Sequence, residues 1–182
     1  MIIINKRTLW LRVNFIINTS LMNNDSDKSP NPNLGLSVNL TPLEETIAYN
    51  FKNKNLLIQA LTHSSFAYEA AQKDISDNQR LEFLGDSILN MVTAEYLYTQ
   101  HPTFAEGELT RLRALLVNRD NLSKKAIQLN LGQYLLLGKG EEKCKGRQNP
   151  TNLSGALEAV IAAIYFDSGL NTAQEFILQI LS

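Results

Sequence analysis

Residues 152–169 place the strongest constraint on the fold that this chain can adopt. The segment reads NLSGALEAVIAAIYFDSG, and apolar side chains fall on almost every face of the helix that it predicts. A helix that is apolar nearly all round is a buried helix, so other elements must surround it. One acid, Glu158, stands inside its apolar run, and the DSG at residues 167–169 is typical of a helix end.

The rest of the body predicts helices and no sheet. TPLE predicts a helix start with Thr41 as N-cap, Pro42 in the first helical position and Glu44 in a capping box. No alternating run is long enough for a strand, and there is no internal repeat. We therefore expect an all-α helical bundle. Helical patterns, separated by short turn signals, occur near residues 42–50, 54–62, 79–99, 106–117, 121–130, 151–166 and 171–181.

The composition is that of a globular protein without a strongly basic body. The chain has 182 residues, 44% hydrophobic and 19% charged, which is enough for one domain with a sizeable core. The formal net charge is −1, and residues 1–24 contain three basic residues and no acid, so the remainder carries −4. An acidic body argues against binding nucleic acid by bulk charge alone. It is compatible with an acidic cleft that metal ions neutralise.

The first 40 residues read as an extension to a body that spans residues 41–182. Basic residues break the apolar runs of residues 1–24, so no stretch reaches the length of a membrane span or resembles a secretory signal. This segment is either an organelle transit peptide or a disordered extension. Residues 23–40 follow it and have the composition of a flexible linker. The single cysteine, Cys144, fits a reducing compartment. We expect a cytoplasmic protein, or an organellar one if residues 1–24 are a transit peptide.

Two carboxylates share one face of the helix predicted around residues 78–98. Glu82 and Asp86 are four residues apart in NQRLEFLGDSIL, so their side chains are neighbours on the helix surface. Like charges at this spacing destabilise a helix by roughly 0.2–0.5 kcal/mol unless a cation lies between them. The pair is either solvated, with Arg80 nearby, or part of a cation site.

Glu158 favours the second alternative. An ionised carboxylate within a buried helix is costly unless it is paired or bound to a metal. Its partner is either an arginine or a metal ion shared with Glu82 and Asp86. Three oxygen donors with no histidine or cysteine beside them suit a hard cation such as Mg²⁺ and not zinc. Because Mg²⁺ held by few carboxylates takes phosphate oxygens as further ligands, such a site suits metal-assisted phosphodiester hydrolysis.

Four blocks of the sequence follow one another in a recognisable order and spacing. They are LTHSSF (61–66), NQRLEFLGDSIL (78–89), EGELTRLRALLV (106–117) and NLSGALEAVIAAIYFDSG (152–169). Together they resemble the catalytic domain of ribonuclease III over about residues 41–182, with RLEFLGDSIL as the most specific part. The resemblance implies an all-α endonuclease-domain fold, a homodimer, and Mg²⁺-dependent cleavage of double-stranded RNA that leaves 5′-phosphate ends. Such enzymes act in RNA processing, including rRNA maturation.

Matched by position, the resemblance assigns roles to four acids. Glu82 would be a metal ligand, and Asp86 a ligand and catalytic carboxylate that positions metal and water. Glu158 would be the most critical metal ligand and a catalytic residue. Glu108, in EGEL, matches a further acid of the family's catalytic valley.

The chain departs from the family pattern at Gly155. Members usually carry aspartate three residues before the last glutamate, whereas Gly155 supplies no ligand and costs about 1 kcal/mol against alanine inside a helix. Gln79 also stands where many members carry an acid. Two interpretations stay open. The chain is an endoribonuclease with weakened or Mn²⁺-favouring activity, or it is a catalytically silent domain that binds RNA or ribosomal partners as a scaffold.

Other segments carry weaker signals. Arg111, Arg113 and Arg119 are candidates to contact RNA phosphates, and the alternative is ordinary surface salt bridges. Residues 138–149, rich in glycine and lysine, predict a solvated flexible loop. His63 lies beside apolar residues and is interpreted as a core or interface histidine.

Two expectations concern partners. The family usually carries a double-stranded-RNA-binding domain after the catalytic domain, and no such domain is expected within this sequence. Phe83 and Leu84 are adjacent large apolar residues beside the acidic stripe, so one of them must face away from the core. With the resemblance, this predicts a homodimer through that face, with RNA and not a membrane as the other partner.

Overall fold

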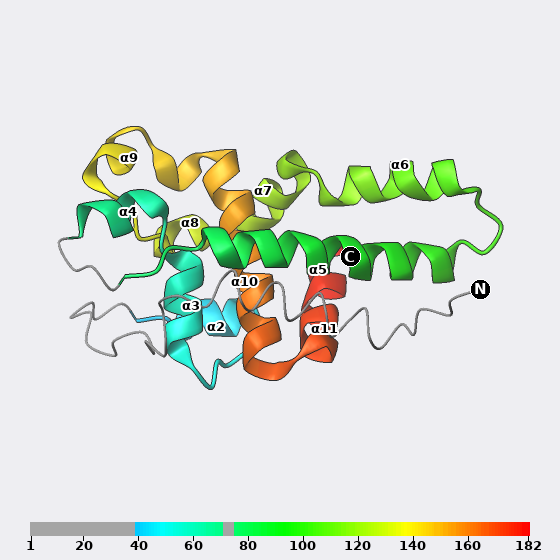
Figure 1. The fold of residues 1–182 in the computed structure, drawn as a ribbon, viewed down its shortest axis with the longest axis horizontal. Helices are drawn as coiled ribbons and strands as arrows, with labels where there is room; N and C mark the ends of the chain where they lie inside the picture. Colours follow the sequence, from blue (N-terminus) through cyan, green and yellow to red (C-terminus); the bar gives the residue numbers. More distant parts are fainter. Residues whose placement is uncertain (1–38, 71–74) are drawn as a thin grey trace, which may run out of the picture. The chain divides into compact units, whose positions relative to one another are not determined.

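The computed structural model describes residues 39–70 and 75–182, and the extension and targeting alternatives predicted for residues 1–38 lie outside those ranges. Within them the regular structure is helical, apart from an isolated bridge between Thr62 and Leu136 (Figure 1). The expected all-α fold is confirmed. The helices are α2 (Thr41–Thr46), α3 (Lys54–Leu61), α4 (Ser64–Glu69), α5 (Gln79–Gln100), α6 (Glu106–Val117), α7 (Arg119–Gln128), α8 (Leu131–Tyr134), α9 (Lys139–Lys143), α10 (Pro150–Ser168) and α11 (Leu170–Leu181).

The core is built around α10. The helix begins where the Asn149 side chain accepts a hydrogen bond from the Thr151 amide at 2.9 Å, with Pro150 at the first helical position. Between residues 153 and 164 every residue except Glu158 is buried. α10 packs against α3, α5, α7 and α11, as a helix that is apolar all round requires. The predicted end at DSG is confirmed, because the next residue after α10 has a φ of +85° that favours glycine.

Gly85 is the point at which α5 and α10 make backbone contact. A Cβ at this position would overlap the backbone carbonyl oxygen of Glu158 and lie 2.5 Å from its carbonyl carbon. Glycine is the residue that permits so close an approach. The inward face of α5 on both sides of this contact is apolar and buried, including Leu81, Ile88 and Leu89. The contact therefore fixes how near the two longest helices of the described chain can lie.

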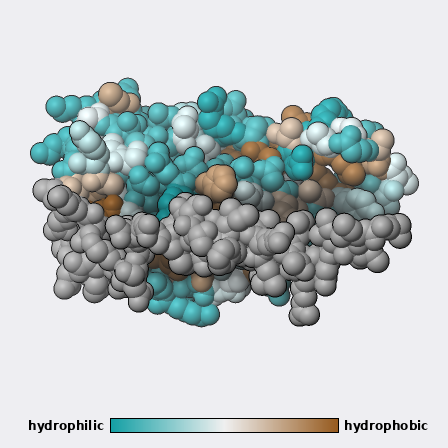
Figure 2. Space-filling model, in the orientation of Figure 1, coloured by the Kyte–Doolittle hydropathy of each residue, from teal (hydrophilic) through white to brown (hydrophobic). Residues whose placement is uncertain are grey.

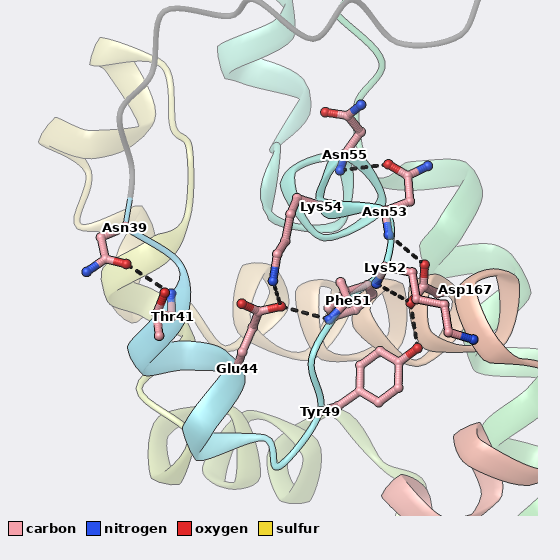
Figure 3. A network of polar contacts seen from close by, with 10 residues as sticks. All are labelled: Asn39, Thr41, Glu44, Tyr49, Phe51, Lys52, Asn53, Lys54, Asn55 and Asp167. Atoms are coloured by element: carbon pink, nitrogen blue, oxygen red, sulfur yellow. Dashed lines mark hydrogen bonds and ion pairs between the residues drawn. The ribbon is translucent and has the colours of Figure 1, made fainter.

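A carboxylate at the end of α10 fixes the segment between α2 and α3 (Figure 3). Asp167 accepts hydrogen bonds from the Tyr49 hydroxyl at 2.6 Å and from the backbone amides of Lys52 and Asn53 at 2.8 and 2.9 Å. Burial raises the pKa of Asp167 and these donors lower it, with a net pKa below its ordinary value. The network ties the end of α10 to the start of α3.

The predicted capping box at Thr41 is wrong. α2 begins at Thr41 itself, and its N-cap position, Leu40, offers no side-chain hydrogen bond. Glu44 is instead 3% exposed and accepts hydrogen bonds from the backbone amide of Phe51 at 2.8 Å and from the Lys54 ammonium (Figure 3). A buried carboxylate must find donors, and the donors available here come from residues that follow the helix.

The flexible loop predicted for residues 138–149 is also wrong, because the segment contains α9 and a short 3-10 turn. The Glu69 carboxylate on α4 accepts hydrogen bonds from the amides of Lys139 and Gly140 at 2.8 and 3.3 Å. The Arg147 guanidinium donates to three backbone carbonyls in and beside α8. These partners are distant in sequence, so local composition did not reveal them.

The described surface is largely hydrophilic on the face that Figure 2 shows, with small hydrophobic patches. None of the described helices is long and apolar enough to cross a membrane. Large apolar side chains are nevertheless strongly exposed at Tyr68, Phe83 and Tyr98, at 91%, 78% and 74%. Single exposed apolar residues are ordinary, so a partner surface is indicated only where others lie beside them.

Candidate active site

The contact at Gly85 brings acids from two helices to one place. Glu82 precedes Gly85 by three positions and Asp86 follows it directly, while Glu158 is the α10 residue whose backbone Gly85 meets. Glu82 and Glu158 are half-buried and Asp86 is exposed. The three acids predicted from the sequence therefore lie around one helix crossing, at the boundary between the core and solvent.

The pKa values of the two glutamates reflect this proximity. The pKa of Glu158 is raised from its ordinary value of 4.5 to about 8, chiefly by burial and in part by the negative charges of Asp86 and Glu82. Burial also raises the pKa of Glu82, where the charge of His63 opposes the rise and those of Asp77 and Asp86 add to it. The negative charges of Asp86 and Glu82 thus make Glu158 harder to ionise, and the charge of Asp86 does the same to Glu82.

Within the described ranges, no basic side chain forms a salt bridge with Glu82, Asp86 or Glu158. The arginine that the sequence allowed as a partner of Glu158 is therefore not found in residues 39–70 and 75–182. Because like charges gathered without a partner repel one another, the cluster suits a cation taken from solvent. The ion pairs of those ranges join Lys54 to Glu44, Arg119 to Asp120 and Arg147 to Glu142.

The donor set fits a hard divalent cation. All three candidate ligands are carboxylates, which Mg²⁺ prefers. Across the described part of the chain, no three His, Cys, Asp or Glu side chains are arranged so that they alone could hold a metal ion. Mg²⁺ is usually bound through one or two carboxylates, with water and substrate phosphates as the other ligands. The acids present fit that mode, which needs no closed protein cage.

Gly155 is buried directly against Glu82. A Cβ at residue 155 would lie 2.8 Å from Cδ of Glu82 and 2.9 Å from each of its carboxylate oxygens. Residues 155 and 158 are three apart on α10, so they share one face of the helix. The Glu82 carboxylate therefore occupies the space that a side chain at 155 would need, one helical turn from Glu158.

Asn90 is a site residue that sequence reasoning missed. Its side-chain amide donates to Asp86 Oδ1 at 2.8 Å and to the Asp86 backbone carbonyl at 2.9 Å. The contact orients the Asp86 carboxylate, while Asp86 itself stays exposed to solvent. The signal in the sequence was the spacing, since an amide four residues after an acid lies beside it on a helix.

His63 is half-buried, and one of its ring nitrogens is satisfied, in line with the prediction of a structural histidine. Nδ1 accepts a hydrogen bond from the Ser65 amide at 3.2 Å and lies 2.8 Å from Ser65 Oγ. That oxygen accepts from the Gly138 amide at 2.9 Å, which leaves the hydroxyl proton for Nδ1. In the neutral ring the proton then sits on Nε2. The sequence did not show that this ring acts electrostatically on Glu82.

Glu108, Arg111 and Arg113 lie on α6, which runs beside α5 (Figure 1). Glu108 is exposed, and its carboxylate accepts a hydrogen bond from the Ala105 amide at 2.9 Å at the helix start. Its charge is not among those that shift the pKa values of the two glutamates at the crossing. Neither arginine forms an ion pair within the described ranges. The structure thus brings together three of the predicted acids, and Glu108 makes a local contact at the start of α6.

Known proteins are similar to this chain over most of its length. Residues 53–182, more than half of the chain, match the family described as Ribonuclease-III-like. The chain belongs to the ribonuclease III-like family. It is 46% identical over 143 residues to the protein named Ribonuclease 3 from Dehalococcoides mccartyi, covering 79% of this chain and 60% of that protein. It is 48% identical over 139 residues to Ribonuclease 3 from Aliarcobacter butzleri, covering 76% and 59%.

Solved structures of ribonuclease III nuclease domains share the fold of this ribonuclease III-like chain. A nuclease-domain structure from Campylobacter jejuni has a TM-score of 0.73 and 44% identity, covering 79% of this chain and 96% of that chain. A second structure of that domain has a TM-score of 0.72 and the same identity. The predicted resemblance and endonuclease-domain fold are confirmed. The chain spans about 60% of the length of the curated relatives that it matches.

In the absence of divalent cations, the raised pKa of Glu158 predicts a loss of stability as the pH rises. Between pH 4.5 and about 8 the unfolded chain releases this proton while the folded chain keeps it, so the free energy of unfolding falls across that window. Glu158→Gln should remove this dependence. In EDTA, we expect the variant to unfold at a similar temperature to the unaltered chain near about pH 5 and at a higher temperature near about pH 8.

Glu95→Gln is the matched control, because it changes an exposed glutamate on α5. It should follow the unaltered chain at both pH values. If Glu158→Gln and the unaltered chain lose stability in parallel as the pH rises, Glu158 is not the strained acid described above.

Proposed function

We propose that this chain is an endoribonuclease of the ribonuclease III type that hydrolyses phosphodiester bonds in double-stranded or structured RNA with Mg²⁺. The observation that carries the proposal is the gathering of three acids at the Gly85 crossing without a basic partner in the described ranges. The relatives named Ribonuclease 3 and the nuclease-domain structures support it. The catalytic domain would comprise residues 41–182, and its substrates would belong to RNA processing, including rRNA maturation.

The acids at the crossing would have two tasks. Glu82, Asp86 and Glu158 would be the candidate ligands, of which one or two would hold the metal ion at a time, and Asp86 would also position the attacking water. When bound, Mg²⁺ supplies Lewis-acid stabilisation of the charge that develops on the phosphate. Asn90 holds the Asp86 carboxylate in place to accept a hydrogen bond from that water. The water oxygen would bond to phosphorus as the bond to the 3′ oxygen breaks. The water would lose a proton to the Asp86 carboxylate and the 3′ oxygen would take one from solvent, which would leave a 5′-phosphate and a 3′-hydroxyl.

Contacts with the RNA backbone would come from α6. Arg111 and Arg113 form no ion pair within the described ranges, so their guanidinium groups are available to phosphates there. Glu108, on the same helix, would be a further acid beside the substrate. Since the body is acidic overall, these arginines and the metal ion would supply the attraction that bulk charge does not.

Gly155 supports a second candidate function. With glycine at this position the cluster holds three acids, and a catalytically silent ribonuclease III-like domain that binds RNA or ribosomal partners would tolerate that. An intermediate outcome is an enzyme whose activity is weak with Mg²⁺ and better with Mn²⁺. Cleavage separates these proposals, because the two functions share the same fold.

We propose that the chain forms a homodimer through the surface around Phe83. Phe83 is 78% exposed and borders a groove of about 1130 Å³ that is also lined by Leu56, Leu84 and Phe166. A two-fold arrangement would place Phe83 of each copy in the groove of the other. The Campylobacter jejuni nuclease-domain structure is described for flexibility in a region involved in dimer formation, which supports the same assembly for this chain.

We also propose that the protein works in a reducing compartment, the cytoplasm. Cys144 is exposed and forms no disulfide, which fits a reducing environment. The organellar alternative depends on residues 1–24, which lie outside the described part of the chain. Fluorescence microscopy of the chain with and without those residues would separate the two locations.

Cleavage of a long RNA duplex tests the proposed function. In single-turnover assays with Mg²⁺, the unaltered chain should cut the duplex and leave 5′-phosphate ends. Glu158→Ala should slow cleavage roughly 100-fold or more. Loss of a residue that only supports a metal ligand typically costs roughly 10- to 100-fold, and loss of a ligand itself should cost at least as much. Glu95→Ala, a change of an exposed acid on α5, should cut at the unaltered rate.

The same assay repeated with Mn²⁺ separates the alternatives. Cleavage by the unaltered chain with Mn²⁺ and weak cleavage with Mg²⁺ would identify a weakened enzyme. No cleavage with either metal would support the scaffold and rule out the enzyme. A Glu158→Ala variant that cuts as fast as the unaltered chain would show that the acids at the crossing are not the active site.

Phe83→Ala tests the proposed dimer. Burying one phenylalanine contributes about 1.5–3 kcal/mol, and the two-fold interface contains the residue twice. Together these contribute about 3–6 kcal/mol, so we expect the dimer dissociation constant to rise roughly 100- to 20,000-fold, as measured by sedimentation equilibrium. Tyr68→Ala, which removes an exposed aromatic ring on α4 outside the groove, should leave the constant unchanged. Sedimentation of the unaltered chain as a monomer at micromolar concentration would contradict the proposal.

A further inference from the structure

Three helical glycines differ in what an added side chain would meet. At Gly85 a Cβ would meet the backbone of α10, which cannot give way without moving the helix. At Gly107 on α6 nothing lies within 4 Å of the added atom. At Gly155 the three nearest atoms belong to the Glu82 carboxyl group, at 2.8 and 2.9 Å. The missing side chain at 155 therefore governs one carboxylate and not the spacing of helices.

The Glu82 carboxylate is placed by this gap. Its side chain extends from α5, and its end lies on the bare Cα of Gly155, on the same face of α10 as Glu158. A Cβ needs more room than 2.8–2.9 Å, so even a methyl group at 155 would displace the carboxyl group. The displaced group is the far end of a flexible side chain, and the fold would remain intact.

We propose that Gly155 is a positioning residue, whose bare Cα seats the Glu82 carboxylate against α10 beside Glu158. On this account Glu82 takes the place that a side chain at 155 would occupy, and its carboxylate lies close to α10 because residue 155 has no side chain. The inference rests on the proposed function for its use in metal binding. The seat itself is a property of the chain without metal.

The proposal changes what Gly155→Asp would do. An aspartate would bring a carboxylate to the face of Glu158, but its Cβ would displace the carboxylate of Glu82. The substitution would therefore add a fourth acid only by moving the carboxylate of Glu82 from its present position. The gain from Gly155→Asp should then be largest where Glu82 has already been replaced by glutamine.

The seat is tested without metal by following the carboxyl carbon of Glu82 in a chain labelled with ¹³C-glutamate. Its resonance is assigned as the one that disappears in Glu82→Gln. In Gly155→Ala the resonance should move, with an unfolding temperature equal to or above that of the unaltered chain, since alanine favours a helix over glycine. Gly107→Ala is the control and should leave the resonance in place. An unmoved Glu82 resonance in Gly155→Ala overturns the proposal, whatever the chain does with metals.

The consequence for the site is tested by Mn²⁺ binding, followed by electron paramagnetic resonance. Gly155→Ala should weaken Mn²⁺ binding roughly tenfold, a typical loss when the support of a ligand is removed, and Gly107→Ala should not. In a Glu82→Gln background the same substitution should change binding by less than about twofold. Equal weakening with and without Glu82 would show an effect through the helix and overturn the proposal.

The two tests also separate this inference from the proposed function. If the unaltered chain binds no Mn²⁺, the metal-dependent function fails, and the carboxyl resonance still decides whether Gly155 seats Glu82. If Mn²⁺ binds but neither the resonance nor the affinity responds to Gly155→Ala, the function stands and the seat is rejected. A larger gain in Mn²⁺ affinity from Gly155→Asp in the Glu82→Gln background than in the unaltered chain would support the displacement of Glu82, and an equal gain would count against it.

Discussion

The backbone contact between α5 and α10 at Gly85 is the constraint on which the rest of the site depends. Glycine inside a helix costs about 1 kcal/mol against alanine, so its place among the buried residues of α5 requires a compensating contact. That contact is the close approach to the backbone of Glu158. Because Glu82 and Asp86 flank Gly85 along α5, the approach that joins the helices also gathers the acids.

The gathered acids oppose the stability that the crossing provides. Most of α10 is buried in apolar surroundings, and Glu158 is held at the edge of that core with a pKa raised to about 8. Without a cation, burial and mutual repulsion both favour its protonated form. A fold that keeps such a group is paying stability for an arrangement that is useful once a cation and a phosphate are present, which is common at functional sites.

Local sequence patterns predicted the helices and which of their faces are buried or acidic. Apolar side chains on almost every face of residues 152–169 predicted a buried helix. The spacing of Glu82 and Asp86 predicted that they share one helix face. Both predictions follow from helix geometry alone. Contacts between distant segments were not predictable in this way. Glu44 was expected to cap its own helix but bonds to the segment that follows, and residues 138–149 fold because Glu69 and Arg147 bind their backbone and neighbours.

Gly155 shows the same limit within the site. The sequence identified it as a missing ligand, because only its own side chain could be considered. The structure shows that Glu82 on α5 lies next to Gly155 and that the Glu82 carboxylate fills the space that a side chain at 155 would need. The contact of Gly85 with α10 was likewise invisible, since a glycine inside a helical pattern does not show which backbone approaches it.

The most direct test of the central contact is the free energy of unfolding of Gly85→Ala, measured by denaturant titration beside Gly107→Ala. Gly107→Ala should gain up to about 1 kcal/mol, because its new methyl group meets nothing and alanine favours the helix. Gly85→Ala should instead lose about 1–3 kcal/mol, because its methyl group forces α5 and α10 apart. If Gly85→Ala gains as much as Gly107→Ala, the two helices do not meet at Gly85, and this account of how the acids are gathered is wrong.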